Sequence, residues 1–519
     1  MRSLVLFILL GAASIVRADP GFAGLKQGPH AVGFKVVQQY DYSRTYKDRI
    51  DVVNGQPIVG ERARPIQTLV WYPAQKVGTP VSYVDYLRTE ATDDEFLRSD
   101  SQVAAFMDNQ LSDAASRVGE VQAKAAFARG MWAVRGANPL AGKYPVVIYA
   151  PGGGGPAHEA ADLGEYLASH GYIVIASRNL GTRTRGLNAD AEGVEAQAGD
   201  IAFLISYAQT LPQADMAHIA AAGWSWGGMT NVFAASRDSR ITALVSFDGT
   251  REPELTKRIS PFKVALPWLY IQRHPQTVAE LNIQGIETSF SLLNELKYSN
   301  VYQVTMYPMQ HGDFSSAMLR FARPGQFSEY SRPEIEQAYH WTARYTLEFL
   351  NAYLKNDKSG LGFMERTPVS NGLAPHMAKV LHTPAQTGLM PGRAGLAAAL
   401  AQQGFDQAPR IYHELHERDP AFVLSEQDVN QWGYQLMRRD NDLPKSIAIF
   451  KFGTVLYPND PNLFDSLGEA QEKNRDVQAA IASYRRSLEL DPKNANAAAR
   501  LAALGGGVSS PAPAASGGR

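Results

Sequence analysis

Short apolar runs recur along the middle of the chain, and each has the length of one β-strand. The runs occupy residues 144–150, 171–177, 218–224, 241–247, 267–272 and 301–307. They are apolar at successive positions, which is typical of strands buried on both faces of a sheet. β-type stretches also occur between residues 31 and 74. The pattern therefore predicts one large central sheet.

Stretches with helical periodicity separate these runs. Apolar residues repeat at helical spacing within 190–211, and a long helix is predicted near 333–355. Alternation of strands and helices favours the α/β class, with a mostly parallel central sheet and helices on both faces. We expect this domain to span residues 19–360, with a largely helical insertion at about 81–140.

Beyond about residue 360 the pattern changes, and no further strand is predicted. Similar residues recur 34 positions apart, as in Ile447 and Ile481 or Pro458 and Pro492. This is the period of tetratricopeptide helix hairpins, each of which buries its apolar face on its neighbour. Leu467-Gly-Glu-Ala470 resembles their consensus.

We therefore expect an α-helical repeat domain at 361–504. Its tetratricopeptide-like units are predicted at about 394–427, 429–462 and 463–496. An unrelated helical bundle is the alternative. The tail, 505–519, consists mostly of Gly, Ser, Pro and Ala, and we expect it to be disordered.

Composition limits the classes of function. The 519 residues are 45% hydrophobic and 19% charged, which is globular, and the length predicts two or three domains. A formal net charge of −1 gives no sign of a nucleic-acid partner, which would favour a basic surface. The chain has no cysteine, so disulfides, thiolate metal sites and a cysteine nucleophile are excluded.

The first residues have the pattern of a secretory signal. Arg2 precedes a run of apolar or small residues at 3–16, and Val16-Arg17-Ala18 places small residues where a signal peptidase cleaves. The run is shorter than the roughly 20 residues of a spanning helix. We expect a signal peptide at 1–18, an exported protein that is periplasmic or secreted, and no integral membrane segment after cleavage. An uncleaved anchor is the alternative.

The candidate nucleophile is Ser225, in Gly223-Trp224-Ser225-Trp226-Gly227. This G-x-S-x-G motif follows a predicted strand and precedes a helix-compatible stretch at 228–236, which is the context of a nucleophile elbow. A serine hydroxyl is a weak nucleophile and needs a base. The alternative is a structural Gly-Ser turn.

His311 is the predicted base, because it follows the last strand of the predicted parallel sheet. Asp248 is the predicted acid, because it comes directly after the run at 241–247, and active-site residues collect at the carboxyl ends of such strands. Glu280 is the other acid that we considered. We interpret Asp313 as a loop carboxylate.

An oxyanion hole needs two backbone donors. Trp226, the residue after the serine, is one candidate. The glycine-rich stretch Pro151-Gly-Gly-Gly-Gly155 follows an early strand, and from it we choose Gly153, with Gly154 as the next choice. The alternative is a flexible turn without a role.

The segments 144–153 and 167–176 and the motif around Ser225 resemble the dienelactone hydrolase-like group of α/β-hydrolases. Within it the chain is most similar to platelet-activating-factor acetylhydrolase-like enzymes over roughly 60–350. The resemblance implies Ser225 as nucleophile, Asp248 as acid, His311 as base, and amides of Gly153 and Trp226 as oxyanion donors. Dienelactone hydrolase itself uses a cysteine nucleophile, which this chain lacks, so a dienelactone is not the expected substrate.

These features predict a serine esterase that cleaves carboxylic esters, or related acyl bonds, through an acyl-enzyme. A peptidase or acyltransferase on the same fold is one rival, and a non-catalytic scaffold that binds a partner through its repeats is another. We expect a small-molecule ester as substrate and a possible protein partner for the repeats. The sequence has no metal-ligand cluster and no phosphate-binding loop, so no cofactor and no metal are expected.

Overall fold

A computed structural model describes residues 21–505 except 52, 250–252, 275–290, 328, 387–389 and 391. The chain divides into two compact units, Met1–Gln386 and Thr387–Arg519. The boundary thus lies after the predicted position at 360. The predicted signal peptide and residues 506–519 of the predicted tail lie outside the described residues.

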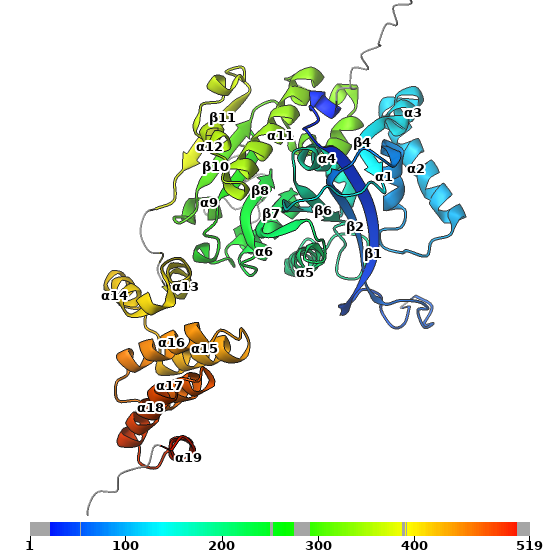
Figure 1. Cartoon of the computed structure of the whole chain (residues 1–519). Coiled ribbons are helices and arrows are strands. Elements are labelled where there is room, and N and C mark those ends of the chain that lie inside the picture. The colour runs from blue at the N-terminus through cyan, green and yellow to red at the C-terminus, as the bar shows by residue number, and fades with distance from the viewer. Residues whose placement is uncertain are drawn as a thin grey trace, which may run out of the picture. The chain divides into compact units, whose positions relative to one another are not determined.

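The first unit is built on a mixed sheet, shown in Figure 1. Among the described residues it has eleven strands in the order β11-β10-β9-β8-β7-β5-β6-β2-β1-β4-β3. Six adjacent strands, in the order β10-β9-β8-β7-β5-β6, run parallel to one another. At the two ends of this group β11 pairs antiparallel with β10, and β2 pairs antiparallel with β6. Their bounds are β1 (Ala31–Thr45), β2 (Ala63–Ala74), β3 (Thr79–Ser82), β4 (Gly130–Arg135), β5 (Tyr144–Ala150), β6 (Ile173–Ser177), β7 (Ala214–Trp224), β8 (Ile241–Phe247), β9 (Trp268–Arg273), β10 (Val301–Met306) and β11 (Ala378–Thr383).

Helices cover both faces of this sheet, as the α/β prediction required. Their bounds are α1 (Tyr83–Glu90), α2 (Asp100–Val118), α3 (Glu120–Ala128), α4 (Ala161–Ser169), α5 (Ala191–Ala208), α6 (Trp226–Ala235), α7 (Pro253–Thr256), α9 (Leu292–Glu295), α10 (Ser316–Arg320), α11 (Arg332–Leu354) and α12 (Lys358–Glu365). Helices α4 and α11 pack with one face, and α5 and α6 with the other (Figure 1). Successive residues of β5 alternate between these two cores: Val147 joins the first and Ile148 the second.

Two strands correct the sequence prediction. β11 pairs antiparallel with β10, although no strand was predicted beyond residue 360. It is an edge strand with mostly exposed residues, so it lacks the apolar run of a buried strand. β4 lies inside the segment predicted as helical and pairs with β1 and β3.

The parallel register brings the predicted site residues to one edge of the sheet. Ala150 at the end of β5 lies opposite Gly223, and Trp224 at the end of β7 lies opposite Phe247. The residues that follow these strand ends are the glycine-rich loop, Ser225 and Asp248. Strand direction alone thus gathers three segments that are far apart in the sequence.

The second unit, described by itself, is helical. Its elements are α13 (Gly392–Gln403), α14 (Ala408–Arg418), α15 (Glu426–Arg438), α16 (Leu443–Leu456), α17 (Pro461–Lys473), α18 (Val477–Leu490) and α19 (Ala495–Ala503). A Cβ on Gly433 of α15 would collide with the Phe450 ring of α16. At the equivalent place, a Cβ on Gly468 of α17 would lie 2.7 Å from the Tyr484 ring of α18.

No helix in the described part of the chain is both long and apolar enough to cross a membrane.

Candidate active site

Ser225 occupies a strained turn between β7 and α6. Its backbone has φ 52° and ψ −123°, a left-handed φ that a residue with a side chain rarely adopts. Glycines permit the tight approach around it, since a Cβ on Gly223 would lie 2.6 Å from the Ala150 carbonyl oxygen and one on Gly227 would collide with it. The turn projects Ser225 at the N-terminus of α6, the geometry of a nucleophile elbow.

His311 lies between Ser225 and Asp248. Its Nε2 is 2.8 Å from Ser225 Oγ, and its Nδ1 is 2.6 Å from Asp248 Oδ2. The His311 side chain is 37% exposed, whereas that of Asp248 is fully buried. The structure thus brings the three predicted residues into one hydrogen-bonded chain that opens to solvent at the histidine.

Further contacts fix the Asp248 carboxylate. The backbone amide of Arg273 donates to Oδ1 over 3.3 Å, and the Arg273 guanidinium Nε lies 3.1 Å from Oδ2. Oδ2 faces both the Arg273 guanidinium and the His311 imidazole, so these two groups hold the carboxylate in place.

The Trp224 side chain contacts both the backbone and the ring of His311. The indole Nε1 donates to the His311 carbonyl oxygen over 2.8 Å, and the two rings are 5.1 Å apart between centroids. The same indole touches the glycine-rich loop, since a Cβ on Gly152 would lie 2.5 Å from its Cε3. One side chain therefore packs against both the histidine and that loop.

The two predicted oxyanion donors lie side by side. A Cβ on Gly153 would be 3.8 Å from the Trp226 Cβ. In the described part of the chain, neither backbone amide donates to a protein acceptor. Leu187 also packs against the loop, with its Cδ2 2.7 Å from the position of that Gly153 Cβ. Both amides are thus available to a negatively charged oxygen of a ligand.

Comparison with known proteins finds a family match in this region. Residues 132–314 match the model of the dienelactone hydrolase family. The matched region includes Ser225, Asp248 and His311, and the match supports a carboxylic ester hydrolase. Among solved structures, the ferulic acid esterase from Streptomyces cinnamoneus is similar, with 19% identity and a TM-score of 0.47 over 68% of this chain and 96% of that one. No curated protein sequence matches the chain.

The hydrolase domain also contains site residues that the sequence did not single out. Glu159, Asn179 and Arg178 contact the glycine-rich loop, and Arg273 contacts Asp248. None belongs to a recognised motif. Arg178, Asn179 and Arg273 reach their partners through the pairing of neighbouring strands, whereas Glu159 lies seven residues after Gly152 on the short helix that follows the loop. For Arg273 a signal existed, since it ends the strand next to the one that precedes Asp248.

The remaining sequence candidates take other places. Asp313 accepts the Gln310 amide over 2.7 Å and caps the short helix that begins at His311, as expected of a loop carboxylate. Glu280 lies outside the described residues. Within the described residues, no group of three His, Asp or Glu side chains could hold a metal ion.

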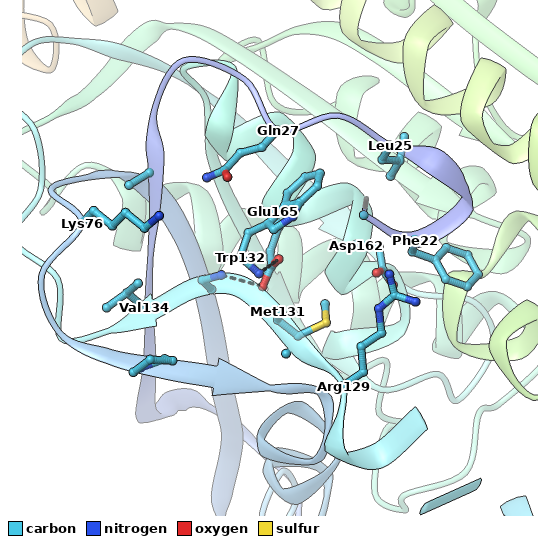
Figure 2. Close-up of a pocket in the computed structure, with 15 residues that line it drawn as sticks. Phe22, Leu25, Gln27, Lys76, Arg129, Met131, Trp132, Val134, Asp162 and Glu165 are labelled. Carbon is cyan, nitrogen blue, oxygen red and sulfur yellow. Dashed lines mark hydrogen bonds between the residues drawn. The ribbon is translucent and has the colours of Figure 1, made fainter. Parts of the chain in front are cut away.

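The hydrolase domain has a further pocket, of about 330 Å³, beside α4 and β4 (Figure 2). Buried Glu165 forms part of its lining and accepts the backbone amides of Trp132 over 2.7 Å and Ala133 over 3.1 Å and the Tyr86 hydroxyl over 2.6 Å. β4 lies five strands from β7, about 24 Å along the sheet at the usual strand spacing. The Glu165 carboxylate thus anchors the backbone at the start of β4 and has no contact with the Ser225 site.

Proposed function

We propose that the protein hydrolyses carboxylic esters of small molecules through Ser225, His311 and Asp248. One observation carries the proposal: the imidazole of His311 bridges the Ser225 hydroxyl and the Asp248 carboxylate at 2.8 and 2.6 Å. These distances are within hydrogen-bond reach, as a base and its orienting acid require. The family of the surrounding domain supports the same chemistry.

The proposed reaction has two steps. Neutral His311 takes the hydroxyl proton as Ser225 Oγ attacks the ester carbonyl carbon, while Asp248 accepts Nδ1–H and fixes the tautomer. The carbonyl oxygen becomes negative and accepts hydrogen bonds from the backbone amides of Gly153 and Trp226. Protonated His311 then gives its proton to the departing alcohol, which leaves the acyl group on Oγ. Water, deprotonated by His311, releases the acid and restores the serine.

A series of p-nitrophenyl esters of increasing acyl length tests this proposal. We expect wild type to hydrolyse at least one, and Ser225→Ala to lose at least about 1,000-fold in kcat. Unchanged hydrolysis by Ser225→Ala would contradict the proposal. Anilide substrates and added alcohol acceptors in the same assay distinguish an esterase from a peptidase or an acyltransferase.

For the second unit we propose tetratricopeptide-type hairpins, α15 with α16 and α17 with α18, that bind a protein partner. Support comes from the equivalent glycine–aromatic contacts, Gly433 with Phe450 and Gly468 with Tyr484. The two glycines are 35 residues apart in the sequence and the two aromatic residues 34.

We also propose that the protein is exported, because an apolar run typical of a signal peptide occupies residues 3–16. A mature N-terminus at Asp19 is the expected result of N-terminal sequencing, and an intact Met1 would contradict cleavage.

A further inference from the structure

The loop proposed to hold the oxyanion is rich in glycine, so external contacts must fix it. Residues 152–155 are four consecutive glycines, the residue type with the greatest backbone freedom. Left to itself, such a segment would sample many orientations of its amides. Catalysis by an oxyanion hole requires donors that are already aimed before the charge develops.

A buried carboxylate holds the amide at the start of this loop. Glu159 is 2% exposed, and its Oε2 accepts the Gly152 amide over 3.1 Å. Its Oε1 accepts the hydroxyl of Tyr149, at the end of β5, over 2.9 Å. Burial raises the pKa of Glu159 to about 8, so the site tolerates a neutral acid at this position.

A buried amide side chain holds the next peptide unit. Asn179 is fully buried, and its Nδ2 donates to the Gly152 carbonyl over 3.0 Å. Gly155 N donates to the same oxygen over 2.9 Å. The peptide unit is planar and trans, so the Gly152 carbonyl and the Gly153 N–H point in opposite directions. Anchoring the carbonyl at Asn179 therefore sets the direction of the Gly153 N–H.

We propose that Glu159 and Asn179 are positioning residues that lock the two peptide units flanking Gly152 and thereby aim the Gly153 amide at the substrate oxyanion. The inference rests on the proposed function and adds two residues to it. Neither side chain touches the reacting atoms; both act through the loop. The contact of Asn179 N with the Gly155 carbonyl, 3.0 Å, ties the far end of the loop to the same residue.

The variants Glu159→Ala and Asn179→Ala test this inference, with hydrolysis of the best p-nitrophenyl ester as the assay. We expect kcat to fall by about 10- to 100-fold, less than the about 100- to 1,000-fold lost when an oxyanion donor is deleted, with KM nearly unchanged. The affinity for a trifluoromethyl ketone, whose adduct with Ser225 places an oxyanion in the hole, should fall in parallel with kcat. Glu159→Gln should recover most of the activity, because its carbonyl oxygen can still accept the Gly152 amide.

Glu165→Ala is the matched control. Glu165 lies on α4 shortly after Glu159, is 2% exposed, and likewise accepts backbone amides and a tyrosine hydroxyl. Its removal should lower stability without the fall in kcat or in ketone affinity. Unchanged kcat in Glu159→Ala and Asn179→Ala, or an equal loss in Glu165→Ala, would overturn the inference. Ser225→Ala in the same series tests the proposed function separately. Retained hydrolysis in Ser225→Ala would mean that the proposed function is wrong, whereas loss of hydrolysis there with unchanged kcat in the other two variants would mean that only the positioning role is wrong.

Discussion

The indole Nε1 of Trp224 donates a hydrogen bond to the backbone carbonyl of His311 over 2.8 Å. The residue before the nucleophile thereby holds the backbone of the base, across 87 positions of sequence. The ring also packs against the imidazole and against the loop at Gly152. Nucleophile turn, base and oxyanion loop therefore share one side chain.

Trp224→Phe removes this hydrogen bond and keeps an aromatic ring. A hydrogen bond of this kind is worth about 1 kcal/mol, so we expect kcat/KM to fall by about 3- to 10-fold. Trp224→Ala should lose more, because it also opens a gap beside His311. Steady-state kinetics with one ester measure both effects, and wild-type kinetics in both variants would show that the contact has no influence on the base.

Asp248→Asn keeps the shape of the acid but removes its charge. The amide no longer fixes the imidazole tautomer with its lone pair toward Ser225, and such a change costs about 10,000-fold in kcat in serine hydrolases of this type. We expect a loss of that order with a small change in KM. Asp313→Asn, two residues from His311, is the control and should keep most of the activity; the reverse ranking would identify Asp313 as the acid.

The ion pair of Arg320 with Asp162 is predicted to support stability. Arg320 Nη2 lies 2.8 Å from both Asp162 oxygens, and both side chains are 5% exposed. Asp162→Asn leaves a buried guanidinium with a weaker partner, which should lower the free energy of unfolding by about 3 kcal/mol. Urea denaturation measures the change. A loss below about 1 kcal/mol would mean that the Tyr83 ring, 4.1 Å from the guanidinium, suffices to hold the cation.

Glu165 should make stability depend on pH. Burial raises its pKa from 4.5 to about 7, so the folded protein keeps this proton to higher pH than the unfolded chain does. The free energy of unfolding should therefore fall, by about 3 kcal/mol, as pH rises from about 4.5 to about 7. Denaturation of wild type and Glu165→Gln across this range isolates the effect, since other buried carboxyl groups are common to both. Parallel curves would contradict it.

The sequence predicted those site residues whose position follows from strand direction. Ser225 and Asp248 come directly after buried strands, and His311 follows the last parallel strand, so the sheet alone places them together. Glu159 and Asn179 could not be predicted this way. Their roles depend on contacts with Gly152, which lies 7 residues from Glu159 and 27 residues from Asn179 in the sequence. These contacts exist only in the folded chain.

The same limit applies to the fold. The six buried runs gave strands within a few residues of their observed bounds, because a strand covered on both faces must be apolar throughout. β11 has polar exposed positions at the edge of the sheet, so it lacks such a run. The apolar run of β4, 131–134, is only four residues long and directly follows two helices, so it does not stand out as a strand. Both strands are fixed by pairing with strands distant in the sequence, and such partners are not visible in a local pattern.

The central claim, that Ser225 is the nucleophile, is tested most directly by covalent labelling. The full chain is treated with a fluorophosphonate and examined by intact mass and peptide mapping, beside Ser225→Ala and His311→Ala. The account predicts one phosphonyl group on wild type, located on Ser225, none on Ser225→Ala and slow labelling of His311→Ala. Equal labelling of Ser225→Ala, or a wild-type protein that hydrolyses esters without being labelled at Ser225, would contradict it.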